Sequence, residues 1–548
     1  MSAHESRVNR LTVLIFFILS VCFLFFACPY KLVFKEQIVL FEFTRSFLAE
    51  LFSKPAAIAE LFGTFITQFF IYRWAAVLLT VLCVALIWDG FRRVLNAAGS
   101  AHSTISALLP AAAELVLCCR YEYPLSMTIG AAIAVWMALG CIKLKNKTAR
   151  TAVSALCALV SYPVAGIHCL LFFIALPAGT ETKPLRYFGI LACAVAYIFA
   201  SGKLYLVDAA QTFSYPLITG SAIGNVYTLY ITEILALCAV AAGKLRWPAL
   251  VPASIVLILT VAALFLTRDS KSEYDLKIST LAYFGRWDKV QQMGKENPFN
   301  SQIGAYYYNV SLAREGKLSD GVMKAYQPLF AGIFLPVETA VGYPKYIASA
   351  DALLLCGDYS QAQHSILTGM TFTPHCRSSR AARKLAEIAI ADGDNDVAVK
   401  YLKMLSHTAV HRRWAEEALE MIESGKTYAL NHNREMLVRA NDFEPALRNI
   451  IESGDSHSST AVEYLICLDL LKKDSDAFIS DFRKYYLPNN AGRPLPKLYL
   501  EALAMLGFGR ESGVPDKTVN ECRDFLSGNH NRYKDTYWYY LLYAQPEK

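Results

Sequence analysis

Long apolar runs fill the chain up to residue 267, whereas the remainder alternates polar and apolar positions in the pattern of amphipathic helices. Apolar runs of this length are typical of membrane helices, because a helix needs about 20 residues to cross the hydrocarbon core. Apolar positions three and four residues apart are instead typical of helices in soluble domains. We therefore predict an all-α protein with two domains, a transmembrane helical domain over 1–267 and a soluble helical-repeat domain over 268–548.

The apolar runs predict about nine membrane spans. The first run, 11–28, has no small-residue cleavage site after it, so we interpret it as an uncleaved span and not as a signal peptide. The run 151–177 is broken by Pro163 and Gly166, which predicts either one long kinked helix or a hairpin of two short helices. The other runs cover 75–91, 104–119, 125–142, 187–202, 226–243 and 249–266.

Basic residues in the loops favour the hairpin. With a hairpin, the basic loops at 92–93, 143–150, 183–186 and 244–246 all lie on one side, and the long loop 203–225 lies on the other. Lys and Arg are enriched in cytoplasmic loops, so this arrangement places the N-terminus inside. It predicts a multi-pass protein of a bacterial inner membrane whose C-terminal domain is periplasmic or extracytoplasmic. A single span would place the C-terminal domain in the cytoplasm.

The first outer loop, residues 29–73, contains two amphipathic stretches at 36–52 and 56–72. Amphipathic helices of this kind tend to lie in the membrane interface and not to cross it. The alternative is a pair of helices that pack over the bundle.

Composition agrees with a chain that is half membrane protein. Hydrophobic residues make up 55% of the sequence, and the mean hydropathy is +0.31. Residues 1–267 hold 19 Lys+Arg and 11 Asp+Glu, whereas the rest holds 34 and 35, so the excess positive charge belongs to the membrane loops. No basic stripe with interleaved aromatic residues occurs in the second half, which argues against nucleic-acid binding. Ten of the 14 cysteines precede Arg268, mostly inside apolar runs, and no CxxC pair indicates a zinc site.

Ionisable side chains gather at the outer face under this topology. Such groups are costly inside apolar spans and often functional. We predict three catalytic acids, Glu36, Glu114 and Asp208, and three substrate-binding residues, Arg120, Glu122 and His168. An acid of this set would act as general base or metal ligand, and Arg120 would contact a phosphate. No cofactor is identified, although a divalent metal ion remains a candidate. The alternative is that these groups form ordinary interfacial ion pairs and that His168 is a packing residue.

The second half repeats a helix, a polar turn and a second helix. The phrases at 308–326, 351–367 and 386–405 share a turn glycine, at Gly316, Gly357 and Gly393, and the stretches 437–451 and 463–482 continue the pattern without one. Over most of 280–510 the chain resembles tetratricopeptide (TPR) repeats. The resemblance implies an α-solenoid that offers a surface to a protein or peptide partner. The alternative is a helical plug that only stabilises the membrane half.

The layout of the first half resembles the GT-C glycosyltransferases, which have a first span, a long outer loop with an acidic residue and then a multi-span bundle. This resemblance implies a polyprenyl-phosphate-linked sugar as donor. Those enzymes commonly carry Asp in the loop, whereas this chain offers Glu36, Glu42, Glu50 and Glu60. In addition, KEQ-x-x-LF at 35–41, QFF at 68–70 and RWDKV with YYYN from residue 286 are similar to an uncharacterised bacterial family of polytopic membrane proteins with TPR-like tails.

Two functional hypotheses follow. The first is a GT-C-like glycosyltransferase in which the repeat domain binds an acceptor or partner. The second is a non-enzymatic membrane scaffold whose repeat domain recruits envelope proteins. A transporter is disfavoured, because the spans show no internal repeat.

Overall fold

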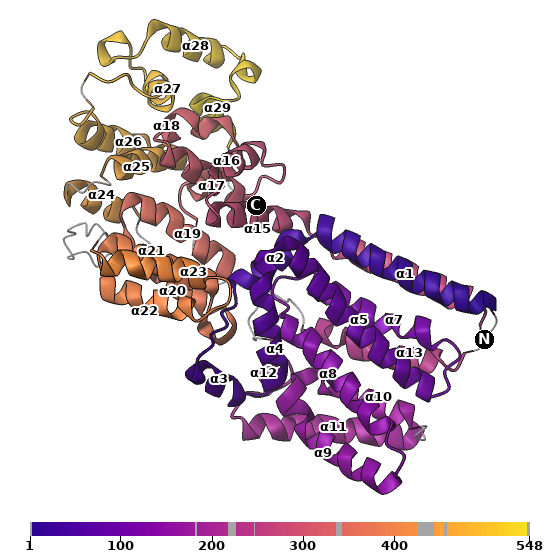
Figure 1. Cartoon of the computed structure of the whole chain (residues 1–548). Coiled ribbons are helices and arrows are strands. Elements are labelled where there is room, and N and C mark those ends of the chain that lie inside the picture. The colour runs from indigo at the N-terminus through magenta and orange to yellow at the C-terminus, as the bar shows by residue number, and fades with distance from the viewer. Residues whose placement is uncertain are drawn as a thin grey trace. The chain divides into compact units, whose positions relative to one another are not determined.

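The computed structural model describes residues 3–180, 184–217, 226–245, 247–335, 342–425, 443–453, 458–490 and 492–544. Every regular element within these ranges is a helix, which confirms the prediction of an all-α chain (Figure 1). The chain divides into two compact units. The first comprises Met1–Glu273, Phe372–Ser379 and Lys403–Ala415, and the second comprises Tyr274–Thr371, Arg380–Leu402 and Glu416–Lys548. Two short segments of the C-terminal half therefore belong to the N-terminal unit.

The first unit is a helical bundle that carries the chain from the N-terminus to the start of α15 (Ser270–Tyr283). Its helices are α1 (Ala3–Phe26), α2 (Pro29–Gln37), α3 (Arg45–Phe52), α4 (Ala57–Thr67), η1 (Gln68–Ile71), α5 (Arg73–Ala97), α6 (Ser103–Ser106), α7 (Leu108–Cys118), α8 (Leu125–Ile142), α9 (Lys147–Ala165), η2 (Gly166–Cys169), α10 (Leu170–Gly179), α11 (Pro184–Leu204), α12 (Ala209–Thr212), η3 (Val226–Tyr230), α13 (Ile231–Ala242) and α14 (Leu250–Leu266).

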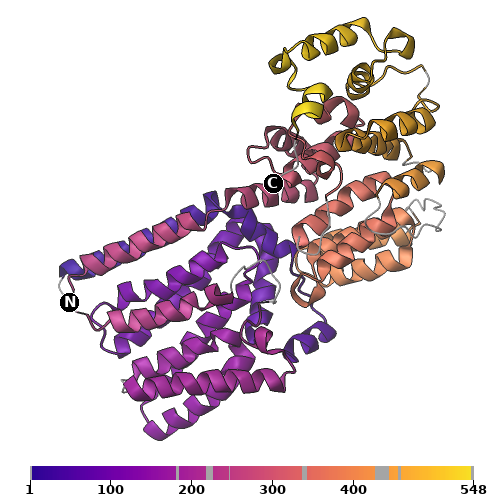
Figure 2. The ribbon, with the colours of Figure 1, turned by 180° about the vertical axis from the view of Figure 1, so that it is seen from behind.

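Helix α8 lies at the centre of this bundle and packs against α4, α5, α9 and α10. Its apolar residues, among them Met127, Val135 and Ala138, are buried in the main core. Helices α1 and α14 lie alongside each other, as Figure 2 shows from behind. The central helix is therefore enclosed by protein, whereas the peripheral helices present apolar side chains outward, as a membrane protein does.

Five helical stretches in the described part of the chain are long and apolar enough to cross a membrane. They are Glu5–Phe26, Arg73–Ala97, Leu125–Ile142, Lys147–Gly179 and Arg186–Leu204. A sixth is added if the bent pair Leu250–Leu266 and Ser270–Tyr283 forms one span. The predicted runs 104–119 and 226–243 correspond to shorter apolar helices, so nine spans remain a prediction.

The stretch Lys147–Gly179 reverses direction at η2. Gly130, near the start of α8, lies against the carbonyl of Ala165, whereas Gly179 lies against Ile142 at the end of α8. The chain therefore runs along α8 to Gly166, which has a φ of 64°, and then back along it. A glycine accommodates this left-handed φ without the steric cost of a Cβ. This geometry corresponds to the hairpin alternative.

The second unit continues as antiparallel helix pairs. Its helices are the rest of α15, α16 (Trp287–Glu296), α17 (Gln302–Arg314), α18 (Leu318–Gly321), η4 (Val322–Lys324), η5 (Leu329–Gly332), α19 (Tyr343–Cys356), α20 (Tyr359–Met370), α21 (Ser379–Asp392), α22 (Asn395–Ser406), α23 (Arg412–Glu423), α24 (Phe443–Ser453), α25 (Ser458–Lys472), α26 (Ser475–Asp481), η7 (Phe482–Tyr486), α27 (Lys497–Met505), η8 (Arg510–Ser512), α28 (Asp516–Leu526), η9 (His530–Tyr533) and α29 (Tyr537–Tyr543). The ends of α21, α22 and α23 that fall within 372–379 and 403–415, and η6 (Pro374–Cys376), belong to the first unit.

The turn glycines of the repeat pattern end their helices. Gly316, Gly357 and Gly393 have φ values of 65°, 83° and 76°, in the left-handed region that glycine favours at helix C-termini. Helices α19 and α20 pack closely on either side of Gly357. Residues 437–442 of the predicted repeat at 437–451 lie outside the described residues. The TPR-like solenoid stays a prediction, although its helix–turn–helix phrases are present.

Candidate functional site

Helix α2 carries an unusual number of buried charges in the first unit. Glu273 holds the start of this helix, because its carboxylate accepts from the amides of Tyr30 at 2.7 Å and Lys31 at 3.1 Å. These amides have no partner within the helix, so Glu273 replaces the missing side-chain cap at Cys28. Burial raises the pKa of Glu273 to about 7.

Lys35 and Glu36 are adjacent on α2, and each is only 2% exposed. The Lys35 ammonium donates to the carbonyl of Cys118 in α7 at 2.9 Å. Burial lowers the pKa of Lys35 below its ordinary value, because the charged form loses its hydration. Two charged residue types therefore lie within protein at consecutive positions, which is costly unless each is compensated.

Glu36 is held by the segments of the C-terminal half that belong to this unit. Its Oε1 lies 2.7 Å from Nε2 of His411, and its backbone carbonyl accepts from the Ser379 hydroxyl at 2.9 Å. His411 is itself buried, and its amide donates to the hydroxyl of Thr408. The second oxygen of Glu36, Oε2, is buried and has no hydrogen-bond partner among the described residues. Glu36 therefore has one carboxylate oxygen that is free to accept a hydrogen bond, a feature that it shares with Glu233.

The other acids of the first loop form a different kind of cluster. Arg377 pairs with Glu42 and, at 3.1 Å, with Glu50. His375 lies 3.1 Å from Glu60, and 2.9 Å from the ammonium of Lys54. We call these six residues the loop network: Glu42, Glu50, Lys54, Glu60, His375 and Arg377.

Each carboxylate of the loop network meets a cationic or ring nitrogen, and Glu60 also accepts from the Tyr215 hydroxyl at 3.1 Å. Partial burial disfavours ionisation of Glu50, but the hydrogen bond from Lys54 and the nearby positive charges lower its pKa overall. The loop network therefore holds the first loop to the segment Phe372–Ser379 with its charges compensated.

A third cluster lies inside the bundle, where α7, η2 and α13 meet. The Thr232 hydroxyl donates to Glu114 at 2.8 Å, and the Tyr123 hydroxyl reaches both Glu114 at 3.2 Å and Nε2 of His168 at 3.0 Å. Nδ1 of His168 lies 2.6 Å from Glu233. All five residues are buried.

Counting protons defines the charge state of this cluster. The single hydroxyl proton of Tyr123 serves one acceptor; when it goes to Glu114, His168 must donate to Tyr123 through Nε2. The contact to Glu233 then needs one further proton, carried either by Nδ1 of His168 or by the Glu233 carboxyl. Both placements satisfy the contacts and leave one net negative charge within the apolar bundle.

Among the described residues, no group of three or more His, Cys, Asp or Glu side chains is arranged to hold a metal ion.

One known protein family matches the chain. The model of a family of unknown function (DUF6057) matches residues 4–544. The chain belongs to the DUF6057 family. The expected likeness to an uncharacterised family is thus confirmed, and the match covers nearly the whole chain. The match does not address the GT-C and TPR-like resemblances. No curated protein and no solved structure matches the chain significantly.

Within this DUF6057 chain, the predicted site residues fall in four places. Glu114 and His168 lie together in the bundle cluster, and Glu36 lies on α2 beside His411. Arg120 and Glu122 lie in the turn between α7 and α8. Burial raises the pKa of Glu122, and the charge of Arg120 opposes that rise.

The hydrogen bonds of Asp208 join it to its own helix and to none of these groups. It is exposed, and its carboxylate accepts from the amides of Ala210 and Gln211 at the start of α12, as an N-cap does.

Sequence reasoning missed the partners from the second half of the DUF6057 chain. His411 lies 375 residues from Glu36, and His375 lies 315 residues from Glu60. Both histidines occur in short polar turns between helices, where a lone His carries no motif. The only available signal was the density of His and Arg in the turns PHCR at 374–377 and HRR at 411–413.

Proposed function

We propose that this protein is a membrane-embedded transferase in which Glu36 is the general base that activates an acceptor hydroxyl. The observation that carries the proposal is the buried Glu36 carboxylate, with one oxygen held by His411 and the other without a hydrogen-bond partner among the described residues. A saturated carboxylate could not accept a proton from a substrate without first losing a partner. Oε2 of Glu36 has no such partner to lose.

The donor we propose is a polyprenyl-phosphate-linked sugar. In the transfer, the acceptor hydroxyl passes its proton to Glu36, the acceptor oxygen bonds to the anomeric carbon, and the bond from that carbon to the phosphate oxygen breaks. Polyprenyl phosphate then leaves with the bonding electrons. A cation must meet the phosphate, and Arg120 is the candidate because guanidinium groups match phosphate oxygens in geometry. The apolar helices and the GT-C-like layout of the first half support a lipid-linked donor.

Mutation of Glu36 tests the proposal directly. In a deletion strain, the lipid-linked donor should accumulate and be identifiable by lipid mass spectrometry. Wild-type protein should clear it, whereas Glu36→Gln should lower the rate by about 10²–10⁴-fold, the usual contribution of a general base. Asp208→Asn, which changes an exposed helix cap in the same way, should clear the donor normally. Full complementation by both Glu36→Gln and Arg120→Gln would favour the envelope scaffold instead.

The sidedness of this site is part of the proposal. Under the hairpin topology, the chain ends on the outer side of a bacterial inner membrane, where polyprenyl-phosphate sugars are used by enzymes of the GT-C layout. A phosphatase fused after Lys548 should then be active, and a fluorescent protein fused there should be dark. The reverse result would place Glu36 on the cytoplasmic side and remove the proposed donor.

A further inference from the structure

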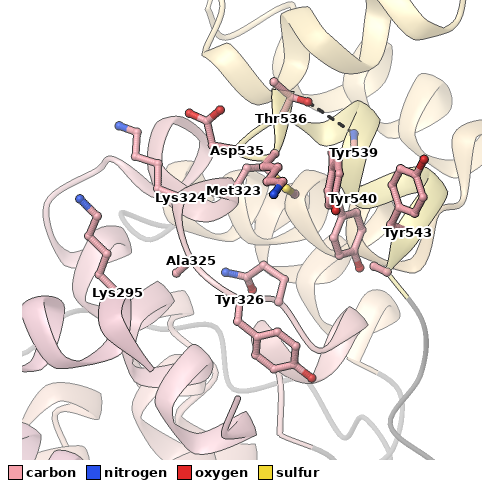
Figure 3. A pocket seen from close by; sticks show the side chains of 13 residues that line it. Lys295, Met323, Lys324, Ala325, Tyr326, Asp535, Thr536, Tyr539, Tyr540 and Tyr543 are labelled. Atoms are coloured by element: carbon pink, nitrogen blue, oxygen red, sulfur yellow. Dashed lines mark hydrogen bonds between the residues drawn. The ribbon is translucent and has the colours of Figure 1, made fainter. Parts of the chain in front are cut away.

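A cavity of about 590 Å³ lies within the second unit, far along the chain from the site described above. One wall is the segment Met323–Gln327 together with Lys295 at the end of α16, and the other is the C-terminal stretch from Lys534 to Ala544. Figure 3 shows Lys295 and Lys324 at one side of the cavity and the rings of Tyr539, Tyr540 and Tyr543 at the other. Cavities of this volume are in the range that binds small ligands.

The C-terminal wall is tied to the unit by hydrogen bonds. Helix α29 begins at a Thr536 cap, whose hydroxyl accepts from the Tyr539 amide at 3.4 Å (Figure 3). Trp538, which is 1% exposed, donates from its indole to the carbonyl of Glu501. Lys473 holds the other end of the helix, because its ammonium donates to the carbonyls of Leu541 and Ala544. The sequence DTYWYYLLYA therefore packs one aromatic face into the unit.

Two further rings of α29, Tyr539 and Tyr543, line the cavity. They lie 4.6 Å apart, and Tyr543 is 47% exposed and is held by a hydrogen bond between its hydroxyl and Nδ1 of His530. Tyr326 lies on the opposite wall. Beside it, the Gln327 side chain accepts from the Asn309 amide at 2.8 Å and donates to the Asn309 side-chain oxygen at 3.2 Å. The rings are therefore presented by two walls that are each held from behind.

The charge of the cavity is positive. Lys295, Lys324 and Lys534 line it, all three are exposed, and none forms an ion pair with a described carboxylate. The acid in the lining is Asp535, which lies 3.4 Å from the ammonium of Lys497 and is thereby already compensated. Three ammonium groups around one paired acid favour a ligand with more than one negative charge.

We infer that this cavity binds an acidic saccharide. Anionic groups of the ligand would meet the three ammonium groups, and its sugar rings would lie on the tyrosines, because ring C–H groups carry partial positive charge and the faces of aromatic rings are negative. The lining has neither an Arg cluster nor a sheet edge, which are the usual features of acidic-peptide and extended-peptide recognition. This inference concerns a second site and does not depend on the transferase proposal.

Binding of a defined acidic trisaccharide tests the inference. Full-length protein in detergent is titrated with trigalacturonic acid by calorimetry, and in parallel with its neutral methyl ester and with glucose 6-phosphate. The carboxylated trimer should bind, its methyl ester should bind at least about tenfold more weakly, and affinity should fall with added salt. Glucose 6-phosphate binding more tightly than the trimer would assign the same chemistry to a phosphorylated sugar.

Variants locate the binding to the cavity. Lys324→Gln/Lys534→Gln should weaken trigalacturonate binding by at least about tenfold, and Tyr543→Ala should also weaken it, whereas Lys517→Gln, on an exposed helix face outside the cavity, should not. These exposed positions can be changed without loss of the fold. Absence of binding by the acidic trimer, equal binding of its methyl ester, or tighter binding of a triglutamate peptide would each overturn the inference.

Discussion

Two sets of carboxylates from the same first loop differ in how completely they are satisfied. Glu42, Glu50 and Glu60 each meet a cationic or ring nitrogen within the loop network. Glu36 uses one oxygen for His411 and leaves the other without a hydrogen bond. Both sets lie in one compact unit and both contact turns from the C-terminal half. The difference separates a structural role, in which each carboxylate meets a cationic or ring nitrogen, from the chemical role that we propose for Glu36, in which one oxygen is kept for a substrate.

Glu273 provides the largest test of this comparison, because it anchors the helix that presents Glu36. The unfolded chain ionises this group near its ordinary pKa of 4.5, whereas burial raises the folded pKa to about 7. The folded state binds the proton more tightly, so stability should fall as pH rises from 4.5 to 7 and then level off. The free energy of unfolding should fall by about 3 kcal/mol over this interval, since one pKa unit corresponds to about 1.4 kcal/mol.

Thermal denaturation of the detergent-solubilised protein from pH 4.5 to 8 measures this effect. Glu273→Gln keeps an acceptor oxygen for one of the two helix amides and removes the titration, so its melting temperature should vary less with pH over this interval. An equal pH dependence in wild type and variant would show that another group is responsible.

Arg377 tests the carboxylates of the loop network, which are paired. Arg377→Leu leaves Glu42 and Glu50 without their guanidinium partner, and Glu42 is buried. We expect a loss of about 2 kcal/mol, somewhat below the cost of breaking a fully buried pair, because Arg377 is 25% exposed. Arg510→Leu, at a highly exposed position, should cost little.

A double variant distinguishes loss of the pair from loss of packing. In Arg377→Leu/Glu42→Leu the unpaired buried charge is gone, so part of the lost stability should return. If the double variant loses more stability than the two single variants lose together, then the loop network does not act through charge compensation.

Parts of this arrangement follow from sequence and parts do not. The break at Gly166 was predictable, because Pro163 and a following glycine interrupt an apolar run that is too long for one span. The turn glycines of the repeats were predictable for a similar reason, since local backbone geometry is encoded locally. The burial of Glu114 was also predictable, because it lies within an apolar helix.

The pairing of charges across the chain could not be predicted. Glu36 and His411 lie 375 residues apart, and nothing in the sequence near either residue specifies the other. For the same reason, the exposed Asp208 was grouped with the buried acids from its loop position alone. Contacts between distant turns depend on how helices pack, and packing is a property of the whole unit.

His411 tests the proposed role of Glu36, because it is the residue that positions the Glu36 carboxylate. His411→Leu removes the side chain that holds Oε1 of Glu36 in place, so the rate of donor turnover should fall by about tenfold. His411→Gln places an amide N–H near the position of Nε2, so it should retain most of the rate. If both variants lose the same rate, then His411 contributes only to folding.

Glu50 gives the smallest expected effect and marks the limit of the comparison. It is 33% exposed, so solvent competes with its contacts to Lys54 and Arg377, and each such ion pair contributes about 1 kcal/mol or less. Its folded pKa lies below the unfolded value of 4.5, so its contribution is present above pH 4.5 and is lost as pH falls through the folded pKa. Melting curves of wild type and Glu50→Gln should therefore differ slightly at pH 7 and converge as the pH falls well below 4.5. A difference that persists at acid pH would mean that Glu50 stabilises the loop by packing. Glu50 and Glu36 would then not differ because the oxygens of Glu50 are paired.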